Sequence, residues 1–268
     1  MARVLVTGGT GKLGREVVAS LLAREHSACV LSHRAHAVVP RGVELFQGDM
    51  ATGAGLREAL AGVDAIIHCA SSPQSALQAD VEGTRLLLQA AHESGSPHIV
   101  YISIVGVDRS DYPYYKAKLE AERLIEDVGL PWTILRATQF HDYVLRLILS
   151  FGADTLAEVP VAGGLRFQSI DVREVADRLV ALMEQREQKE QGEQRGVGRA
   201  PDMGGPEVRT IEEMAEVYLG IRGRKITIRA EKRPGELYDV FRSGINLCPE
   251  HADGKISWEV FLRRLYGS

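Results

Sequence analysis

The sequence has few cysteines, no long apolar run and no strong excess of charge, and each of these absences excludes a class of protein. Cys29, Cys69 and Cys248 stand far apart with no C-x-x-C pair, which disfavours a disulfide framework and a structural zinc site. No apolar stretch approaches the roughly 18 residues of a transmembrane helix. The 32 Lys and Arg residues against 36 Asp and Glu give a net charge of −4, which offers no field for nucleic acid or an anionic membrane.

The remaining composition is that of an ordinary globular protein. Of the 268 residues, 45% are hydrophobic and 25% are charged, and this length allows one large core with a smaller appended unit. Residues 2–7 are typical of a buried strand rather than of a secretory signal. We expect a cytoplasmic protein, monomeric or homodimeric, that binds a small-molecule substrate and has no metal site and no nucleic-acid or membrane partner.

Short β-branched runs alternate with amphipathic stretches over the first 136 residues. The predicted strands are 4–7, 28–32, 43–46, 65–68, 99–103 and 132–135, and the predicted helices are 13–23, 81–93 and 115–128. Apolar strands that alternate with helices favour a parallel sheet covered on both faces. We therefore predict the α/β class, with a doubly wound parallel sheet of the Rossmann type in a dinucleotide-binding domain, residues 1–136.

The pattern changes after residue 136. We predict helices at 140–151, 172–183, 211–219 and 258–266, and strands at 158–161, 166–170 and 225–229. Residues 184–196 are mostly Glu, Gln, Arg and Lys, and we interpret them as a solvated helix end or loop rather than an interaction tail. Residues 137–268 are predicted to form a smaller α+β portion that binds substrate, with some elements returning to the core of the first domain.

A glycine-rich turn follows the first predicted strand. Gly8, Gly11 and Gly14 have the spacing G-x-x-G-x-x-G and lead into the first predicted helix. Gly8 permits a sharp turn, Gly11 lets the backbone approach a pyrophosphate, and Gly14 lets the helix pack closely on the strand. The start of the helix offers N–H groups and a positive dipole end to the phosphates. This context indicates dinucleotide binding; a purely structural turn is the alternative.

The end of the second strand decides which dinucleotide binds. An NAD site needs a carboxylate there, whereas an NADP site needs cations for the 2′-phosphate. Ser32 and Arg34 stand at this position, and the first acidic residue after them is Glu44. Arg34 can grip the phosphate, Ser32 can donate to it, and Lys12 can add a second charge. These residues favour NADP(H) over NAD(H).

Six short motifs extend this pattern over most of the chain. They are TGGTGKLG at 7–14, Asp49, DVEGT at 80–84, YISI at 101–104, PYYKAK at 113–118 and IDV at 170–172. Together they resemble the short-chain dehydrogenase/reductase superfamily, and within it the atypical and extended branches that include the NmrA-like NAD(P)-binding proteins. The resemblance implies that a tyrosine exchanges a proton, that a lysine lowers its pKa and holds the nicotinamide ribose, and that a serine polarises the substrate carbonyl.

Two overlapping Tyr-x-x-x-Lys pairs match this group, Tyr112 with Lys116 and Tyr114 with Lys118. The spacing of four puts each pair on one helical face. Pro113 favours an extended backbone for Tyr112 and a first helical turn that contains Tyr114. The Tyr114 register also matches the family pattern, and we prefer it. There are two alternatives. The pair Tyr112 with Lys116 is the functional one, or these aromatic and basic residues only cover the start of a helix.

Other members of the group depart from the family pattern. Asp80 stands where the extended branch usually carries an asparagine, and a carboxylate cannot donate as an amide does. Ser103 matches the family serine, but Ile104 and Val105 follow it where a residue facing the substrate is expected. Ser103 is therefore either catalytic or a strand-end hydroxyl bonded to the backbone. His141 is either a donor to substrate or a structural histidine.

These arguments give one set of site residues and two functions. The predicted catalytic residues are Tyr114, Lys118 and Ser103, and the predicted cofactor-binding residues are Gly8, Thr10, Gly11, Lys12, Leu13, Ser32, Arg34, Asp49, Met50, Ala70, Ser71, Ser72, Lys118 and Thr138. We predict an oxidoreductase that transfers hydride from NADPH to a small carbonyl, quinone-like or conjugated substrate. The alternative is a non-catalytic, NADP(H)-sensing regulatory protein of the NmrA-like type. A sugar-nucleotide epimerase is weaker, because the second half has few basic residues aligned for a diphosphate sugar.

Overall fold

The computed structural model describes residues 1–34, 36–187 and 198–267. These residues belong to two compact units, each built from three stretches of chain. The first unit spans residues 1–103, 113–135 and 173–200, and the second spans residues 104–112, 136–172 and 201–268. The division at residue 136 into a dinucleotide-binding and a substrate-binding portion stays a prediction.

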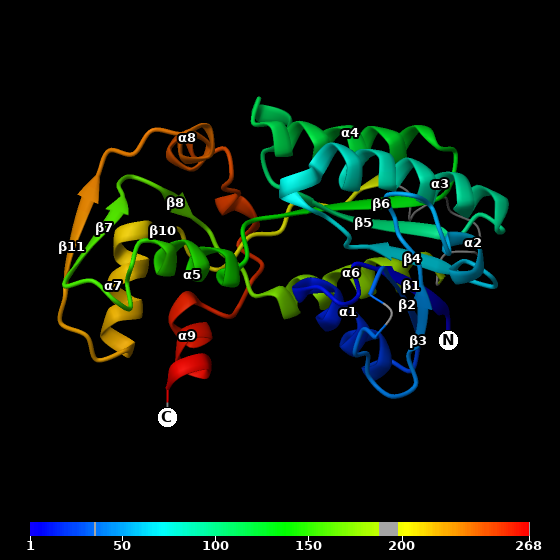
Figure 1. The fold of residues 1–268 in the computed structure, drawn as a ribbon, viewed down its shortest axis with the longest axis horizontal. Coiled ribbons are helices and arrows are strands. Elements are labelled where there is room, and N and C mark those ends of the chain that lie inside the picture. Colours follow the sequence, from blue (N-terminus) through cyan, green and yellow to red (C-terminus); the bar gives the residue numbers. More distant parts are fainter. Residues whose placement is uncertain (35, 188–197, 268) are drawn as a thin grey trace. The chain divides into compact units, whose positions relative to one another are not determined.

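A seven-stranded parallel sheet forms the centre of the first unit (Figure 1), in the order β3-β2-β1-β4-β5-β6-β9. The strands are β1 (Arg3–Thr7), β2 (Ser27–Ser32), β3 (Glu44–Gln47), β4 (Ala65–His68), β5 (His98–Ile104), β6 (Trp132–Ala137) and β9 (Gly198–Arg199). β1 pairs in parallel with both β2 and β4, so the strand order reverses at β1. The predicted doubly wound sheet is confirmed. In such sheets ligands bind outside the carboxyl ends of the strands at this reversal.

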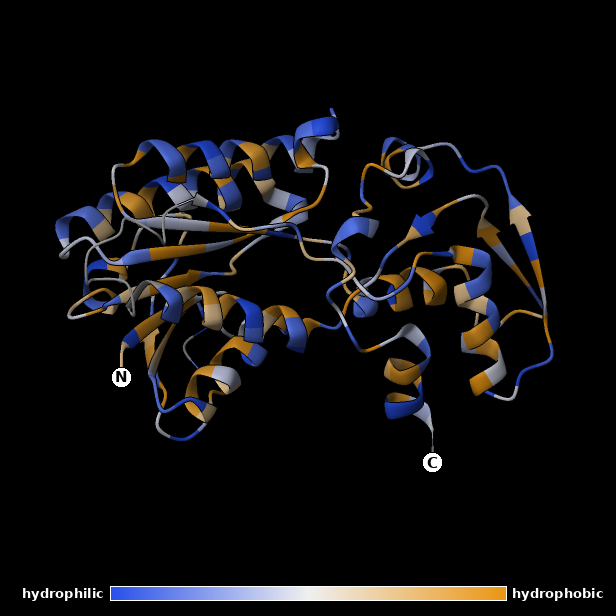
Figure 2. Ribbon diagram, turned by 180° about the vertical axis from the view of Figure 1, so that it is seen from behind, coloured by the Kyte–Doolittle hydropathy of each residue, from blue (hydrophilic) through white to orange (hydrophobic). Residues whose placement is uncertain are grey.

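Helices cover both faces of this sheet (Figure 1). α1 (Lys12–Ala23) and α6 (Val172–Glu187) lie on one face, and α3 (Gly83–Glu93) and α4 (Pro113–Asp127) lie on the other. Ser20 of α1 donates a hydrogen bond of 2.6 Å to Asp177 of α6. The short α2 (Leu56–Ala59) packs beside α3. Polar and apolar residues alternate around these helices, whereas the strands between them are mostly apolar (Figure 2).

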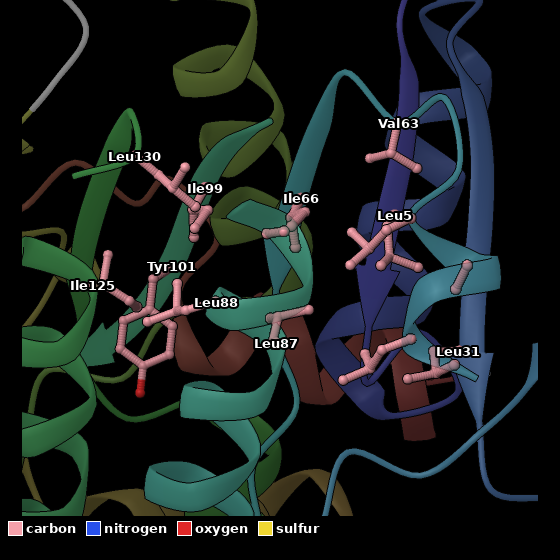
Figure 3. Packing of buried hydrophobic residues seen from close by; sticks show 14 of the residues in the cluster. Leu5, Leu31, Val63, Ile66, Leu87, Leu88, Ile99, Tyr101, Ile125 and Leu130 are labelled. Carbon is pink, nitrogen blue, oxygen red and sulfur yellow. The ribbon is translucent and has the colours of Figure 1, made fainter. Parts of the chain in front are cut away.

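A hydrophobic cluster joins the sheet to α3 (Figure 3). Leu5, Ile66 and Ile99 come from the neighbouring strands β1, β4 and β5 and are fully buried. They lie near Leu87 and Leu88 of α3. Burial of a side chain of this size stabilises the fold by about 1.5–3 kcal/mol. This packing fixes the strands whose carboxyl ends carry the site.

The second unit is a small α+β assembly. Its strands are β7 (Glu158–Ala162) parallel to β11 (Thr227–Glu231), and β8 (Arg166–Phe167) antiparallel to β10 (Arg209–Thr210). Its helices are α5 (His141–Ser150), α7 (Ile211–Ile221), α8 (Glu236–Ser243) and α9 (Trp258–Tyr266), with short turns η3 (Val107–Arg109) and η4 (Pro249–His251). The rings of Phe167 and Phe241 lie 4.7 Å apart in its core.

Several expected elements differ from the observed ones. The strand predicted at 166–170 ends at Phe167, because Ile170 instead exchanges backbone hydrogen bonds with Gln139 and His141. The strand predicted at 225–229 lies at Thr227–Glu231, where pairing with β7 fixes it. The helix predicted at 81–93 is preceded by the turn η1 (Pro73–Ser75) and the π-helical segment η2 (Leu77–Glu82). Of the charged stretch 184–196, residues 188–196 lie outside the described residues.

A helix that spans a bilayer needs about 20 mostly apolar residues. Within residues 1–34, 36–187 and 198–267, no helix is both long enough and apolar enough to cross a membrane.

Candidate active site

The glycine turn joins β1 to α1 and forms a cradle of backbone. Gly8 has φ +67°, and the N–H of Gly11 donates to its carbonyl oxygen at 2.8 Å. A Cβ on Gly8 would lie 2.7 Å from the nitrogen of Ala70, and one on Gly14 would collide with the carbonyl oxygen of Gly8. Within residues 1–34 no side chain caps the start of α1, and its first turn holds no acidic residue. This cradle fits the phosphates of a dinucleotide.

The neighbouring strand ends carry the predicted residues for the adenosine half. Ser32 ends β2, is buried, and accepts the N–H of Arg34 at 3.2 Å, while the Arg34 side chain is exposed. After β3, Oδ1 of Asp49 accepts the N–H of Ala51 at 2.9 Å. β2 and β3 pair in parallel, with Ser32 opposite Gln47. The side chains predicted to bind the adenosine half therefore follow two adjacent strands.

The loop after β4 is held in place by hydrogen bonds from both sides. The N–H of Ala70 donates to Oγ1 of Thr7 at 3.3 Å. The N–H of Ser72 donates to Oδ2 of Asp80 at 3.1 Å. These bonds fix the backbone on either side of Ser71, whose side chain is exposed. The position of Ser71 is therefore fixed by hydrogen bonds to Thr7 of β1 and to Asp80 of η2.

The Ser71 hydroxyl meets the phenol of Tyr114 at 2.8 Å. One turn further along α4, Nζ of Lys118 donates to the carbonyl oxygen of Ile102 at 2.9 Å and lies 3.7 Å from Oδ1 of Asp80. Lys118 is only 2% exposed. Burial lowers the pKa of Lys118, and the carboxylate of Asp80 opposes that shift. The loop after β4 and α4 thus bring two hydroxyls together, and a buried ammonium follows one turn further along α4.

The two Tyr-Lys registers have different surroundings. α4 begins at Pro113, so Tyr114 stands in its first turn, as Pro113 predicts. Lys116 of the other pair is exposed. Tyr112 belongs to the second unit, whereas the cradle, Ser71 and Lys118 belong to the first. The preference for Tyr114 and Lys118 remains a prediction, and the position of both residues in α4 of the first unit supports it.

Comparison with known proteins identifies the family. The model of the NAD(P)H-binding family matches residues 8–186, which is more than half of the chain. The chain is also 31% identical over 232 residues to (4-alkanoyl-5-oxo-2,5-dihydrofuran-3-yl)methyl phosphate reductase of Streptomyces griseus, covering 83% of this chain and 75% of that protein. The chain belongs to the NAD(P)H-binding family. The predicted resemblance to the atypical short-chain dehydrogenases/reductases is thereby confirmed.

Other relatives are matched over shorter segments. Quinone oxidoreductase 2 of Escherichia coli is 29% identical over 140 residues, which are 50% of this chain and 47% of that protein. The photosystem II assembly factor Ycf39 of Trieres chinensis is 28% identical over 166 residues, 59% of this chain and 51% of that protein. The chain therefore spans about half the length of these two relatives.

Solved structures show the same fold. The NADPH complex of the quinone oxidoreductase QOR2 from Escherichia coli superposes with a TM-score of 0.77 at 20% identity, covering 98% of this chain and 99% of that one. Triphenylmethane reductase from Citrobacter sp., complexed with NADP(H), gives a TM-score of 0.68 at 20% identity and covers 99% and 95% of the two chains. At these identities the comparison establishes the fold of an NAD(P)H-binding protein.

The remaining predicted site residues have varied surroundings. Ser103 is buried, and among the described residues its Oγ has no hydrogen-bond partner, so the alternative of a bond to the backbone was wrong. β5 continues to Ile104, so Ser103 lies inside the strand rather than at its end. Thr138 lies in the second unit and donates to the carbonyl oxygen of Gln168 at 2.5 Å. Its contact with cofactor stays a prediction.

His141 is integrated into the core of the second unit. Nδ1 lies 2.7 Å from Oγ of Ser169, and Nε2 lies 2.9 Å from the carbonyl oxygen of Ile256. Burial lowers the pKa of His141. With both ring nitrogens bonded inside the unit, the structural interpretation of this histidine is favoured over that of a donor to substrate.

A buried histidine that the sequence did not single out supports the cradle. Nδ1 of His68 lies 2.6 Å from Oγ1 of Thr7, and Nε2 lies 2.9 Å from Oγ1 of Thr84. Thr84 donates onward to the carbonyl oxygen of Asp80 at 2.5 Å, so it accepts from His68, which places the ring proton on Nε2. Thr7 then donates to Nδ1. This chain of bonds links the end of β1 to the segment that holds Asp80, and it requires a neutral imidazole.

Acid is expected to destabilise the protein through His68. Burial lowers the pKa of His68 to about 3, with Lys118 adding to the shift. Between pH 6.5 and 3 the unfolded chain binds one proton more at this residue, so stability falls as the pH falls. At pH 5 the loss relative to pH 7 is about 2 kcal/mol, measured by urea unfolding. His68→Gln should remove this part of the pH dependence and His92→Gln, on the exposed side of α3, should not. An unchanged slope in His68→Gln would contradict the assignment.

A cavity of about 370 Å³ opens at the other end of the sheet. It is lined by residues that precede β1, β4 and β5, among them Ala2, Asp64 and Pro97. These are the amino ends of the strands, whereas the cradle lies at their carboxyl ends. This cavity is therefore separate from the candidate active site.

Proposed function

We propose that the protein is an NADPH-dependent reductase of a small, apolar quinone or conjugated carbonyl compound. The observation that carries the proposal is the hydrogen bond of 2.8 Å between Tyr114 and Ser71. It supports the proposal because it joins an ionisable hydroxyl to the loop after β4, in the unit that holds the glycine cradle, and reduction of a carbonyl oxygen needs a proton donor. When bound, the reduced cofactor supplies the hydride.

The roles of the polar residues follow from their chemistry. Tyr114 gives its proton to the substrate oxygen. Lys118 stands one helical turn along α4, and its ammonium favours the negative phenolate that this transfer leaves. Because Lys118 is buried and hydrogen-bonded to Ile102, its charge is fixed in place before the reaction begins. A preorganised charge of this kind stabilises a developing anion without reorganisation.

The substrate class rests on the relatives. One is named a (4-alkanoyl-5-oxo-2,5-dihydrofuran-3-yl)methyl phosphate reductase, and the ring in that name has a double bond conjugated with carbonyl groups. Another is named a quinone oxidoreductase. Both names describe electron-poor, conjugated carbonyl compounds. We extend this class, and not the individual compounds, to the present protein.

The preference for NADPH rests on the end of β2. Ser32 accepts the N–H of Arg34, so its own hydroxyl hydrogen is available for a phosphate oxygen. The exposed Arg34 supplies the charge, and no carboxylate follows β2 before Glu44 to accept from a ribose hydroxyl. These features support binding of a 2′-phosphate.

The cofactor assignment predicts the effect of replacing Arg34. Arg34→Ala should raise the Kd for NADPH by roughly 10- to 100-fold, because it removes hydrogen bonds to a charged phosphate. The Kd for NADH should change by less than about twofold, since NADH lacks that phosphate. Titration of nicotinamide fluorescence measures both constants. Arg41→Ala, an exposed arginine on the same connection, is the matched control. Tighter binding of NADH than of NADPH by the wild type would contradict the proposal.

A second function is favoured by the surroundings of Lys118. Its ammonium is engaged by Ile102 and faces Asp80, where the family usually has an asparagine, and Ser103 is buried. A protein with this arrangement could bind NADP(H) and pass a conformational signal to a partner without turnover. Oxidation of NADPH in the presence of a quinone or an enone, followed at the nicotinamide absorbance, separates the two functions. The sensor consumes no NADPH with any acceptor.

A further inference from the structure

We propose that Ser71 returns the proton to Tyr114 after each turnover, an inference that rests on the proposed reductase function. The sequence assigns Ser71 to cofactor binding. In the structure its hydroxyl instead meets the Tyr114 phenol at 2.8 Å. Ser71 is exposed and Tyr114 is half-buried, so the serine is the more accessible of the two hydrogen-bonded residues. Ser71 therefore acts on the reaction through Tyr114.

Lys118 cannot serve as this connection to solvent. Lys118 is 2% exposed, and its ammonium donates to the carbonyl oxygen of Ile102 and lies over the ring of Tyr101, 4.2 Å from the centroid. A proton that entered by this route would have to cross the packed side chains around α4 and β5. Ser71 offers a shorter route, because it is exposed and its hydroxyl is hydrogen-bonded to the phenol.

The loop holds Ser71 ready for this transfer. Ala70 is bonded to Thr7, and Ser72 is bonded to Asp80, so the backbone on both sides of Ser71 is anchored to the first unit. A hydroxyl in a fixed position can accept a proton on one lone pair while it donates its own. A freely moving serine would spend most of its time away from the phenol.

The proton balance closes with water as the source. The substrate gains a hydride, with oxidation of NADPH to NADP⁺, and its oxygen takes the proton of Tyr114, whose O–H electrons stay on the phenolate. Ser71 then gives its proton to the phenolate and takes one from water. Each turnover thus consumes one NADPH and one solvent proton, and Tyr114 and Ser71 return to their starting state.

Ser71→Ala is the variant that tests the relay. We expect kcat for quinone reduction to fall roughly 10- to 100-fold, the lower part of the range for general acid–base groups. The Kd for NADPH, measured by fluorescence without substrate, should change by less than about twofold, since the cradle is untouched. Ser71→Thr keeps a hydroxyl and should recover most of the rate. Ser75→Ala, which removes a hydroxyl bonded to Ser72 in the same loop, is the matched control.

A relay gives a signature that a merely structural residue does not. Imidazole buffer can reprotonate the phenolate directly, so kcat of Ser71→Ala should rise with buffer concentration, while the wild type should not respond. A kcat close to that of the wild type, or a lower kcat without rescue by buffer, would overturn the relay. A raised Kd for NADPH with unchanged kcat would show that Ser71 binds the cofactor and does not relay a proton. A wild type that binds NADPH but reduces no acceptor would refute the reductase itself.

Discussion

Replacing Tyr114 with phenylalanine is expected to lower kcat by roughly 10²- to 10⁴-fold, the usual contribution of a positioned acid. The variant keeps the ring and loses only the hydroxyl that meets Ser71. Both partners lie near the surface, so the lost hydrogen bond should cost the fold no more than about 1 kcal/mol. The Kd for NADPH should remain within about twofold, because the phenol is not part of the glycine cradle.

Steady-state kinetics with a quinone and fluorescence titration with NADPH measure the two effects separately. Tyr112→Phe examines the other register, the pair Tyr112 with Lys116. If Tyr112→Phe loses turnover and Tyr114→Phe keeps it, the choice of Tyr114 and Lys118 is wrong. If both variants keep turnover at the wild-type rate, no tyrosine of this motif supplies the proton. A reductase whose KM alone responds to Tyr114→Phe would use the phenol only to bind substrate.

The elements that could be predicted from the sequence are those fixed by local patterns. Strands β1, β2 and β4 are apolar on both faces because helices cover the sheet, so they stand out as short β-branched runs. The glycine turn could be predicted because only glycine fits at Gly8 and Gly14, where a Cβ would strike the backbone. Pro113 marked the start of α4 for the same kind of local reason.

Other elements depend on partners far away in the chain. β9 and β10 contain two residues each, too few for any periodicity, and they exist only because β6 and β8 lie beside them. α8 was missed although Leu237, Val240 and Phe241 have helical spacing between two glycines. That signal was present in the sequence and could have found it.

The site shows the same limit. Ser71 and Tyr114 are 43 residues apart, and no spacing rule joins them. The bonds of His68 to Thr7 and Thr84 likewise connect strand ends and a helix that meet only in the folded sheet. The sequence marked Asp80 as a departure from the family, but its nearness to Lys118 needed coordinates. Local motifs located the cofactor cradle, whereas the hydroxyl pair and the buried charges emerged from tertiary structure.

Replacing Asp80 with asparagine is expected to lower the free energy of unfolding by about 3 kcal/mol. Oδ1 of Asp80 lies 3.7 Å from Nζ of Lys118, and both side chains are almost fully buried. Removing one partner of a buried ion pair leaves the other charge uncompensated, which typically costs about 3–5 kcal/mol. We expect the lower end, because Glu122 also stabilises the ammonium and an amide oxygen can still accept the N–H of Ser72.

The dependence of this loss on pH identifies its cause. Burial lowers the pKa of Lys118 and Asp80 opposes the shift, so the asparagine variant should lower the pKa of Lys118 further. Above that lowered pKa, and below the unfolded value near about 10.4, the unfolded chain binds one proton more than the folded chain. Rising pH then stabilises the variant more than the wild type. The deficit of Asp80→Asn should therefore shrink between neutral and alkaline pH.

Urea unfolding of a small set of variants completes this test. Glu82→Gln is the matched control, because Glu82 stands two residues away in η2 and its pair with Arg85 is about half exposed, so its loss should stay within about 0.5 kcal/mol. The double variant Asp80→Asn/Lys118→Met removes both charges and should be more stable than Asp80→Asn alone, because no buried charge is then left without its partner. Equal losses in the single and double variants would show that Asp80 acts through Ser72 rather than through Lys118.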